Sequence, residues 1–391
     1  MENNLVYWVW LHQALKHGNN RVENIRSSYG SVKEFYNAGE MGWRLCGCFT
    51  NSQIYSMSNF TLEEAEIILK KSYKLGYDVI SIEDERYPEL LLNIHNPPCV
   101  IYTCGDISCL SGRLSISIVG TRKATKNGLK TAYDISYDLA KSGAVIISGG
   151  ALGVDSEAHK GALDAGGKTV AVLGCGIDYP YLLDQKSLRD KISQNGALIS
   201  EYPPGFEPTA YTFPIRNRII SGLSKGTLII EAGEKSGSLI TANLANDQNR
   251  DVFVTPIENG FEEKFKGSLA LIEDGAAVVT CAEDILKEYD NNFQSGLPPL
   301  NLCNIKKLKV HKIKKEGQKE IKNIEEKPPE KEIPEEYKPV YNALLGGKMH
   351  IDKLSEILNL PIKDLNLKLI EMELLGLVAA SSGKMYEIIK K

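Results

Sequence analysis

The sequence predicts an α/β fold built on a mostly parallel sheet, and three patterns lead to that prediction. Short apolar, β-branched runs recur between residues 115 and 290, and helical segments separate them. The runs are continuous rather than alternating, which is typical of strands buried on both faces of a sheet. Glycine-rich turns follow several runs. A helix that connects two neighbouring parallel strands crosses over with a right-handed turn. The repeat of strand and helix therefore predicts a Rossmann-like, doubly wound domain.

The chain begins with a helical domain, which is predicted over residues 1–75. An apolar, aromatic run at 6–11 reads as the core of a helix rather than as a binding surface. Thr61 can cap a second helix, with Glu63 and Glu64 in its first turn and apolar residues after them.

The central domain is predicted over residues 76–295. Its expected strands are 116–119, 145–147, 169–173, 197–199, 227–230, 252–254 and 277–279, with 77–82 and 100–102 adding strands at one edge. The expected helices between them include 128–141, 155–165, 238–246 and 268–273. The regular alternation of strand and helix places the helices on the faces of the sheet.

Residues 296–336 are predicted to be a charged, flexible linker. Lysines crowd 306–319, while 325–336 is acidic and rich in proline. Such a composition buries no core, so a solvated tether is favoured over a lysine contact with phosphates. Residues 337–391 resume apolar residues at helical spacing until Gly376, followed by a hairpin turning at Ser382 and Gly383. Helices followed by a hairpin predict a winged-helix domain.

The composition limits where charge and cofactors can act. The formal net charge of the 391 residues is −4, so any surface for nucleic acid must be a local basic one. The eight cysteines lack paired metal-ligand spacing, which predicts reduced thiols and no metal. The chain starts without a basic leader and contains no membrane-length apolar run. We therefore expect a cytoplasmic protein with no membrane partner.

Several glycine-rich turns lie at the carboxyl ends of the predicted strands, the edge where open α/β sheets bind ligands. Glycine allows a phosphate to approach the backbone, and N–H groups at helix starts favour an anion. The turns are Gly120-Thr121-Arg122, Ser148-Gly149-Gly150, Gly174-Cys175-Gly176, Glu231-Ala232-Gly233 and Ser236-Gly237-Ser238. Neither a dinucleotide fingerprint nor a P-loop is present. The pattern predicts a groove for a less usual phosphate-bearing ligand.

The stretch 202–218 is the most informative part of the chain. It carries four prolines, four aromatic residues and Arg216-Asn217-Arg218. Aromatic rings such as that of Phe213 can stack on unpaired bases, and arginines near a helix start can hold phosphates. The alternative is a rigid loop whose aromatics pack on the sheet and whose arginines pair with carboxylates such as Glu201 or Glu231.

These segments resemble the DNA-processing protein A family, also called Smf. The resemblance covers about residues 85–290 and rests on 117–122, 148–155 with Ala158 and His159, 172–178, 213–224 and 236–242. It implies an extended Rossmann domain between a sterile-alpha-motif-like helical domain and a winged helix. It also implies a homodimer that binds single-stranded DNA and helps to load a RecA-type recombinase during natural transformation.

By motif position, the resemblance assigns DNA binding to Arg122, Phe213, Arg216 and Arg218. Adding their neighbours gives the predicted site: Gly120, Thr121, Arg122, Phe213, Arg216, Asn217, Arg218, Ser236, Gly237 and Ser238. Two segments depart from the family pattern. A turn that is basic in many members is Ala151-Leu152-Gly153 here, and the usual Val-Pro-Gly is Thr255-Pro256-Ile257, with Gly260 later.

The main interpretation is a DNA-binding protein without catalytic residues, metal or cofactor. One alternative is a nucleotide-processing enzyme, an N-glycosidase or phosphoribohydrolase, that uses Asp155, His159 and Glu231 as acid–base or nucleophilic groups. Another is a winged helix that reads duplex DNA through residues 360–368. That segment offers only Lys363 and Lys368 as basic groups, so protein contact is favoured for it.

Overall fold

The computed structural model describes residues 4–16, 22–180, 185–257, 263–290 and, with short gaps, 337–388. The predicted linker over 296–336, Gly260, Gly376 and the turn at Ser382 and Gly383 lie outside the described residues. The described chain divides into two compact units, residues 1–306 and 307–391. No helix in the described part has the length and apolar character that a bilayer crossing requires.

The described residues among the first 75 form five helices, which agrees with the predicted helical character of this region. They are α1 (Leu5–Leu15), α2 (Val22–Ser28), α3 (Val32–Leu45), α4 (Asn51–Asn59) and α5 (Leu62–Lys74). Thr61 caps α5 as expected: its hydroxyl accepts from the Glu64 N–H, and the Glu64 carboxylate accepts from the Thr61 N–H. The aromatic run of α1 is core, since Trp8 and Trp10 are fully buried.

A nine-stranded sheet follows, in the order β1-β2-β6-β5-β4-β3-β7-β8-β9. The strands are β1 (Asp78–Ser81), β2 (Val100–Gly105), β3 (Ser115–Gly120), β4 (Val145–Ser148), β5 (Lys168–Leu173), β6 (Ala197–Ser200), β7 (Gly226–Ile230), β8 (Asp251–Val254) and β9 (Ala277–Val278). All neighbours from β6 to β9 pair in parallel. The pairs β1–β2 and β2–β6 are antiparallel, and β1 and β2 form the edge that the sequence predicts.

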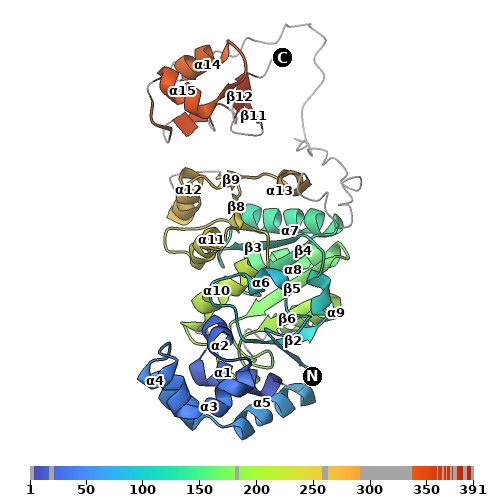
Figure 1. Ribbon diagram of the computed structural model, residues 1–391. Coiled ribbons are helices and arrows are strands. Elements are labelled where there is room, and N and C mark those ends of the chain that lie inside the picture. The colour runs from blue at the N-terminus through green and yellow to red at the C-terminus, as the bar shows by residue number, and fades with distance from the viewer. Residues whose placement is uncertain are drawn as a thin grey trace. The chain divides into compact units, whose positions relative to one another are not determined.

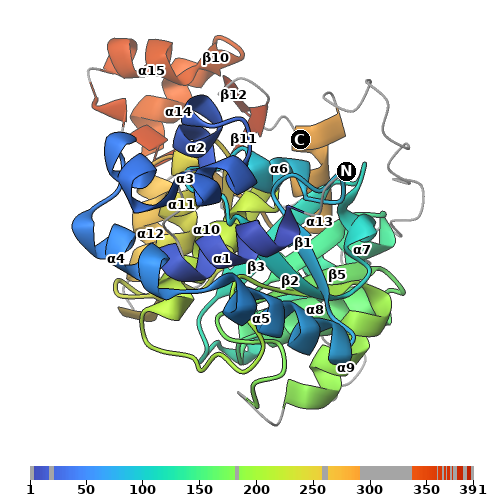
Figure 2. The same ribbon diagram turned by 60° about the horizontal axis from the view of Figure 1, so that its bottom comes forward.

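Helices cover both faces of the sheet (Figure 2). On one face lie α7 (Lys126–Lys141), α8 (Val154–Asp164) and α9 (Lys186–Asn195); on the other lie α10 (Thr212–Gly222), α11 (Gly237–Asp247) and α12 (Lys266–Glu273). Short α6 (Glu89–Leu92) and α13 (Ala282–Asp290) complete the unit. Side chains alternate between the faces, so Ile116 and Ile118 join the cluster under α7 and α8 while Val119 joins the other.

The N-terminal helices gather at the β1–β2–β6 end of the sheet (Figure 1). Their buried residues belong to the same hydrophobic cluster as β1, β2 and α10, so Trp8, Ile80 and Ile219 share one core. Hydrogen bonds reinforce this contact, because the Trp8 indole donates to Glu83 at 2.9 Å. The domain boundary drawn at residue 75 stays a prediction.

The second unit contains α14 (Lys338–Leu344), β10 (Met349–His350), α15 (Ile351–Leu358), β11 (Val378–Ser381) and β12 (Met385–Ile388). Strands β11 and β12 pair antiparallel, which confirms the predicted hairpin, and β10 adds a third strand that the sequence did not suggest. Leu354, Leu365 and Leu369 are fully buried in a core of its own.

Candidate functional site

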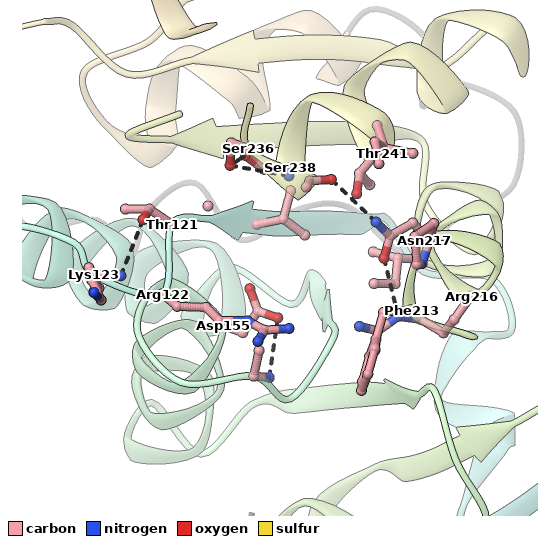
Figure 3. A pocket seen from close by; sticks show the side chains of 17 residues that line it. Thr121, Arg122, Lys123, Asp155, Phe213, Arg216, Asn217, Ser236, Ser238 and Thr241 are labelled. Carbon is pink, nitrogen blue, oxygen red and sulfur yellow. Dashed lines mark hydrogen bonds between the residues drawn. The ribbon is translucent and has the colours of Figure 1, made fainter. Parts of the chain in front are cut away.

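A cavity of about 410 Å³ opens at the carboxyl ends of β3 and β7. These strands are neighbours, yet the helices that follow them, α7 and α11, lie on opposite faces of the sheet. Such a switch point leaves a crevice between two connections that diverge. Figure 3 shows residues of the β3–α7 turn, α8, α10 and the start of α11 around this space.

The floor of the cavity depends on glycines that permit close backbone approach. A Cβ atom at Gly120 would lie 2.0 Å from the Ile230 carbonyl oxygen, so no other residue fits between β3 and β7 at that position. Gly153 has a φ of +84°, and a Cβ there would lie 2.6 Å from the Thr121 carbonyl oxygen. The turn 151–153 therefore packs directly on the Gly120–Arg122 turn, and Ala151 adds an uncharged wall.

Two guanidinium groups lie close to the aromatic ring of Phe213. The guanidinium carbon of Arg122 is 5.7 Å from the ring centroid, and that of Arg216 is 6.0 Å from it. Gly174 makes room for the ring, because a Cβ at that position would lie 2.9 Å from a ring carbon. Arg122 is exposed, so the pocket combines a solvent-accessible cation with an aromatic surface (Figure 3).

Arg216 forms the inner wall of the cavity and is only 5% exposed. Its guanidinium donates to the carbonyl oxygens of Gly149, at 2.8 Å, and Val172. Burial lowers the pKa of Arg216, and the nearby Asp155 carboxylate opposes that effect. Asp155 accepts hydrogen bonds from the N–H groups of Gly149 and Ala151. Arg216 thus links the carboxyl ends of β4 and β5 by hydrogen bonds, and its positive charge lies at the wall of the pocket.

The opposite wall is the start of helix α11. Ser236 caps the helix, with its hydroxyl 2.7 Å from that of Ser238 and accepting from the Ser238 N–H. Nothing lies within 4 Å of a Cβ placed on Gly237, so the first turn of the helix faces open space. The Asn217 amide donates to the Gly237 carbonyl at 3.3 Å and joins α10 to α11. Partial positive charge at this helix start favours an anion.

Arg218 is the predicted site residue that does not line the cavity. Its guanidinium donates to both carboxylate oxygens of Glu201, at 2.6 and 2.8 Å, and to the Asn96 and Ile215 carbonyls. The pair is buried, since Glu201 is 1% exposed. The expectation that Arg218 faces the cavity was wrong, and the alternative pairing with Glu201 is what the structure has.

Two of the three aromatic residues that precede α10 pack against each other, whereas Tyr211 is 81% exposed and does not line the cavity. Tyr202 is buried and stacks on Phe206 at 4.6 Å between ring centroids, so these two rings form part of the fold. Only Phe213 among the aromatics of this stretch lines the cavity.

The three candidate acid–base residues all have structural partners. The Glu231 carboxylate accepts from the Thr125 N–H at 2.7 Å and from its hydroxyl, at the start of α7. His159 Nδ1 donates to the Thr169 hydroxyl oxygen at 2.7 Å, because that hydroxyl gives its own hydrogen to the Ile146 carbonyl. Burial lowers the pKa of His159 to about 3, so it is neutral near pH 7. Asp155 holds the turn described above.

The cavity therefore collects nine of the ten predicted residues: Gly120, Thr121, Arg122, Phe213, Arg216, Asn217, Ser236, Gly237 and Ser238. Sequence reasoning missed the exposed Lys123, although it follows Arg122 in the same turn, and the apolar rim of Pro214 and Ile240. Among the residues that the structure describes, no group of three His, Cys, Asp or Glu side chains is placed to hold a metal.

A doubly wound α/β domain with a cationic, aromatic-lined cavity at its switch point, and a winged-helix unit after it, is the architecture of a nucleic-acid-binding protein. Comparison with protein-family models gives the family. Residues 78–290, more than half of the chain, match DNA recombination-mediator protein A, and 325–384 match the DprA winged helix domain. The chain belongs to the DNA recombination-mediator protein A family.

Curated relatives agree with this assignment. The chain is 35% identical to Protein Smf of Synechocystis over 324 residues, which cover 78% of each chain. It is 39% identical to DNA processing protein DprA of Bacillus subtilis, over 57% of this chain and 75% of that protein.

Two solved structures have the same fold. DNA processing protein A of Streptococcus pneumoniae matches with a TM-score of 0.61 and 31% identity, over 72% of this chain and 97% of that one. DNA processing protein A of Helicobacter pylori, described by its single-stranded DNA binding mode, matches with a TM-score of 0.50 and 32% identity, over 55% of this chain and 96% of that one.

Proposed function

We propose that the cavity at the β3–β7 switch point binds single-stranded DNA. The observation that carries this proposal is Phe213, flanked by the guanidinium groups of Arg122 and Arg216 at the anion-favouring edge of the sheet. An aromatic face beside phosphate-binding groups suits unpaired bases, whose rings are accessible only outside a duplex. The structure of the Helicobacter pylori relative, described by its binding mode for single-stranded DNA, supports the same ligand.

Each wall has a distinct task in this proposal. The exposed Arg122 and Lys123, with the N–H groups at the start of α11, take phosphates. Phe213 takes a base on its face. The guanidinium carbon of Arg122 lies 5.7 Å from the ring centroid, so a base stacked on this face requires the side chain to turn toward a phosphate. Arg216 stays in place, because its hydrogen bonds to two strand ends fix it.

A fluorescence anisotropy titration with oligothymidylates at several salt concentrations tests this proposal. Phe213→Ala should weaken binding about fivefold to 150-fold, the loss of one base stack worth about 1–3 kcal/mol. Arg122→Ala should also weaken binding and reduce the slope of log Kd against log salt by about 0.7, the value for one phosphate contact on a single strand.

Matched controls come from exposed residues away from the cavity. Arg113→Ala removes an exposed arginine from the opposite end of β3, and Tyr55→Ala removes a ring that is 72% exposed in α4. Both should bind like the unmodified protein. Tighter binding to duplex than to single strands, or full affinity in Phe213→Ala and Arg122→Ala together, would refute the proposal.

We further propose that the chain acts as a cytoplasmic homodimer that hands single-stranded DNA to a RecA-type recombinase, during natural transformation and recombination. Membership of the recombination-mediator family supports this role. The expected result is faster recombinase filament formation on DNA coated with single-strand-binding protein, and no acceleration by Arg122→Ala. Size-exclusion chromatography with light scattering tests the dimer, and a monomer at working concentration would contradict it.

A further inference from the structure

Two thiols face each other in the turn between helices α3 and α4. The turn is Cys46-Gly47-Cys48, and the two Sγ atoms lie 3.1 Å apart. Both side chains are partly exposed, and neither cysteine forms a disulfide bond in this structure. Cys99, Cys109 and Cys175 are buried instead, and burial raises the pKa values of Cys109 and Cys175. Cys46 and Cys48 therefore combine proximity with access.

The backbone of the turn is set by its flanking elements. Gly47 has a φ of +69°, a left-handed conformation that glycine adopts without strain, and nothing lies within 4 Å of a Cβ placed there. Cys46 ends α3, and Thr50 starts α4 with a complete capping box to Gln53. Because both ends are held, the thiols meet in the folded chain without further ordering.

The distance between the sulfurs leaves little to move. A disulfide bond is about 2.05 Å long, so the two Sγ atoms need to approach by only about 1 Å. The Ser28 hydroxyl oxygen lies 3.7 Å from Cys46 Sγ and offers a polar contact rather than an apolar cover. A small molecule can thus reach the pair from solvent.

We propose that Cys46 and Cys48 form a redox-active dithiol that exchanges with low-molecular-weight disulfides such as glutathione disulfide. The thiolate of one cysteine attacks a glutathione sulfur, which forms a mixed disulfide and releases one glutathione thiolate. The second cysteine, as its thiolate, then attacks the bound protein sulfur and releases the other glutathione. The protein loses two protons and two electrons, and glutathione disulfide is reduced to two thiols.

The bond formed in this way is a reversible one. It closes a loop of only three residues, so it gains little of the chain-entropy stabilisation that long loops give. Small, exposed disulfides have higher reduction potentials than structural ones and are the labile kind. The site lies in the N-terminal helices, separate from the cavity at the sheet edge, and the proposal is independent of DNA binding.

The test equilibrates the reduced full-length protein with mixtures of reduced and oxidised glutathione. Remaining thiols are trapped with N-ethylmaleimide, and peptides are mapped by mass spectrometry. The expected product is a peptide containing Cys46 and Cys48 that lacks two hydrogens and carries no label, with the dithiol restored in excess reduced glutathione.

Single-cysteine variants make the result specific. In Cys46→Ser the remaining Cys48 should accumulate as a mixed disulfide with glutathione, because no second thiol resolves it, and Cys48→Ser should do the same at Cys46. The controls Cys104→Ser and Cys281→Ser, each removing a partly exposed cysteine, should leave the oxidised pair unchanged. Full labelling of both cysteines in the most oxidising mixture, or a bond from either one to another cysteine, would overturn the proposal.

Discussion

Arg216 and Arg218 stand two residues apart in helix α10, and their guanidinium groups serve different neighbours. Arg216 reaches the cavity and the ends of β4 and β5, whereas Arg218 is paired with Glu201 behind the helix. Residues two positions apart on a helix point in nearly opposite directions. Both arginines are therefore held by the fold, and Arg122 and Lys123 are the exposed cations of the pocket.

Arg218→Met should destabilise the protein by about 3–5 kcal/mol, because it leaves the Glu201 carboxylate buried without its partner. Urea unfolding followed by tryptophan fluorescence measures this, since Trp8, Trp10 and Trp43 all lie in the first unit. Under conditions where the variant is folded, the salt slope of DNA binding should equal that of the unmodified protein. A slope reduced as in Arg122→Ala would place Arg218 on the DNA instead.

His159 should make stability fall as the pH drops below its unfolded-state pKa of 6.5. Its folded-state pKa is about 3, so between these values the unfolded chain binds a proton that the folded one excludes. The free energy of unfolding should lose about 2 kcal/mol from this residue between pH 6.5 and pH 5, and nothing above about pH 7.

The matched variant is His159→Gln, whose amide can still donate to Thr169 but does not titrate. Its unfolding free energy should change less with pH over the same window. His12 is also buried with a lowered pKa, so some slope remains in the variant. An identical pH dependence in the two proteins would mean that His159 does not stay neutral in the folded state.

At the scale of elements, the sequence predicted the sheet well because each strand carries its own signal. Continuous apolar runs such as those of β3 and β7 end in glycine or polar turns, and these local features survive in the fold. The start of α10 is different. The sequence placed Arg216-Asn217-Arg218 at the helix start, but the helix begins at Thr212. Both arginines therefore lie inside the helix, where a spacing of two residues points their side chains in nearly opposite directions.

Tertiary partners explain the remaining differences at this scale. Glu201 follows β6 directly, and nothing in its local sequence says that it is buried beside Arg218 rather than at the ligand edge. The glycine at 120 was predicted for a phosphate approach, whereas its tightest contact is the Ile230 carbonyl of the neighbouring strand. The Glu201–Arg218 contact spans 17 residues and the Gly120–Ile230 contact joins two strands 110 residues apart, so a local pattern reveals neither of them.

Gly237→Asp in helix α11 should weaken ligand binding without lowering the stability of the helix. An aspartate in the first turn favours the helix dipole, and its side chain has open space, so the fold should be unchanged or slightly more stable. The same carboxylate would occupy the anion-favouring end of the helix and repel phosphates. Binding of oligothymidylate should weaken about fivefold at low salt, and Gly237→Asn should have a smaller effect. Equal affinity in the aspartate variant would remove α11 from the proposed site.

At the scale of the whole molecule, the two compact units have separate hydrophobic cores. Every residue that lines the cavity belongs to the first unit. The N-terminal helices are part of that unit, because Trp8 and Ile80 lie in one cluster. The composition of the preceding linker made the winged-helix unit recognisable in the sequence. No comparable change in composition indicates that the N-terminal helices share a core with the sheet at the β1–β2 edge.

A chain ending at residue 306 should therefore bind single-stranded DNA within about twofold of the full-length protein, because it keeps every residue that lines the cavity. Anisotropy with the same oligothymidylate measures this. Residues 307–391 alone should give a helical circular dichroism spectrum and no comparable affinity. Abolished binding in the shortened chain would show that the winged helix takes part in the DNA site.

The walls of the cavity come from residues 119–123, 151–155, 213–220 and 236–241, so the site is assembled from four stretches scattered over about 120 positions. A chain emerging from the ribosome builds strands β3 to β6 first, yet lacks α10 and α11. The complete cavity can therefore form only after residue 241 has left the exit tunnel. If the cavity is the DNA site proposed above, shorter nascent chains lack that site.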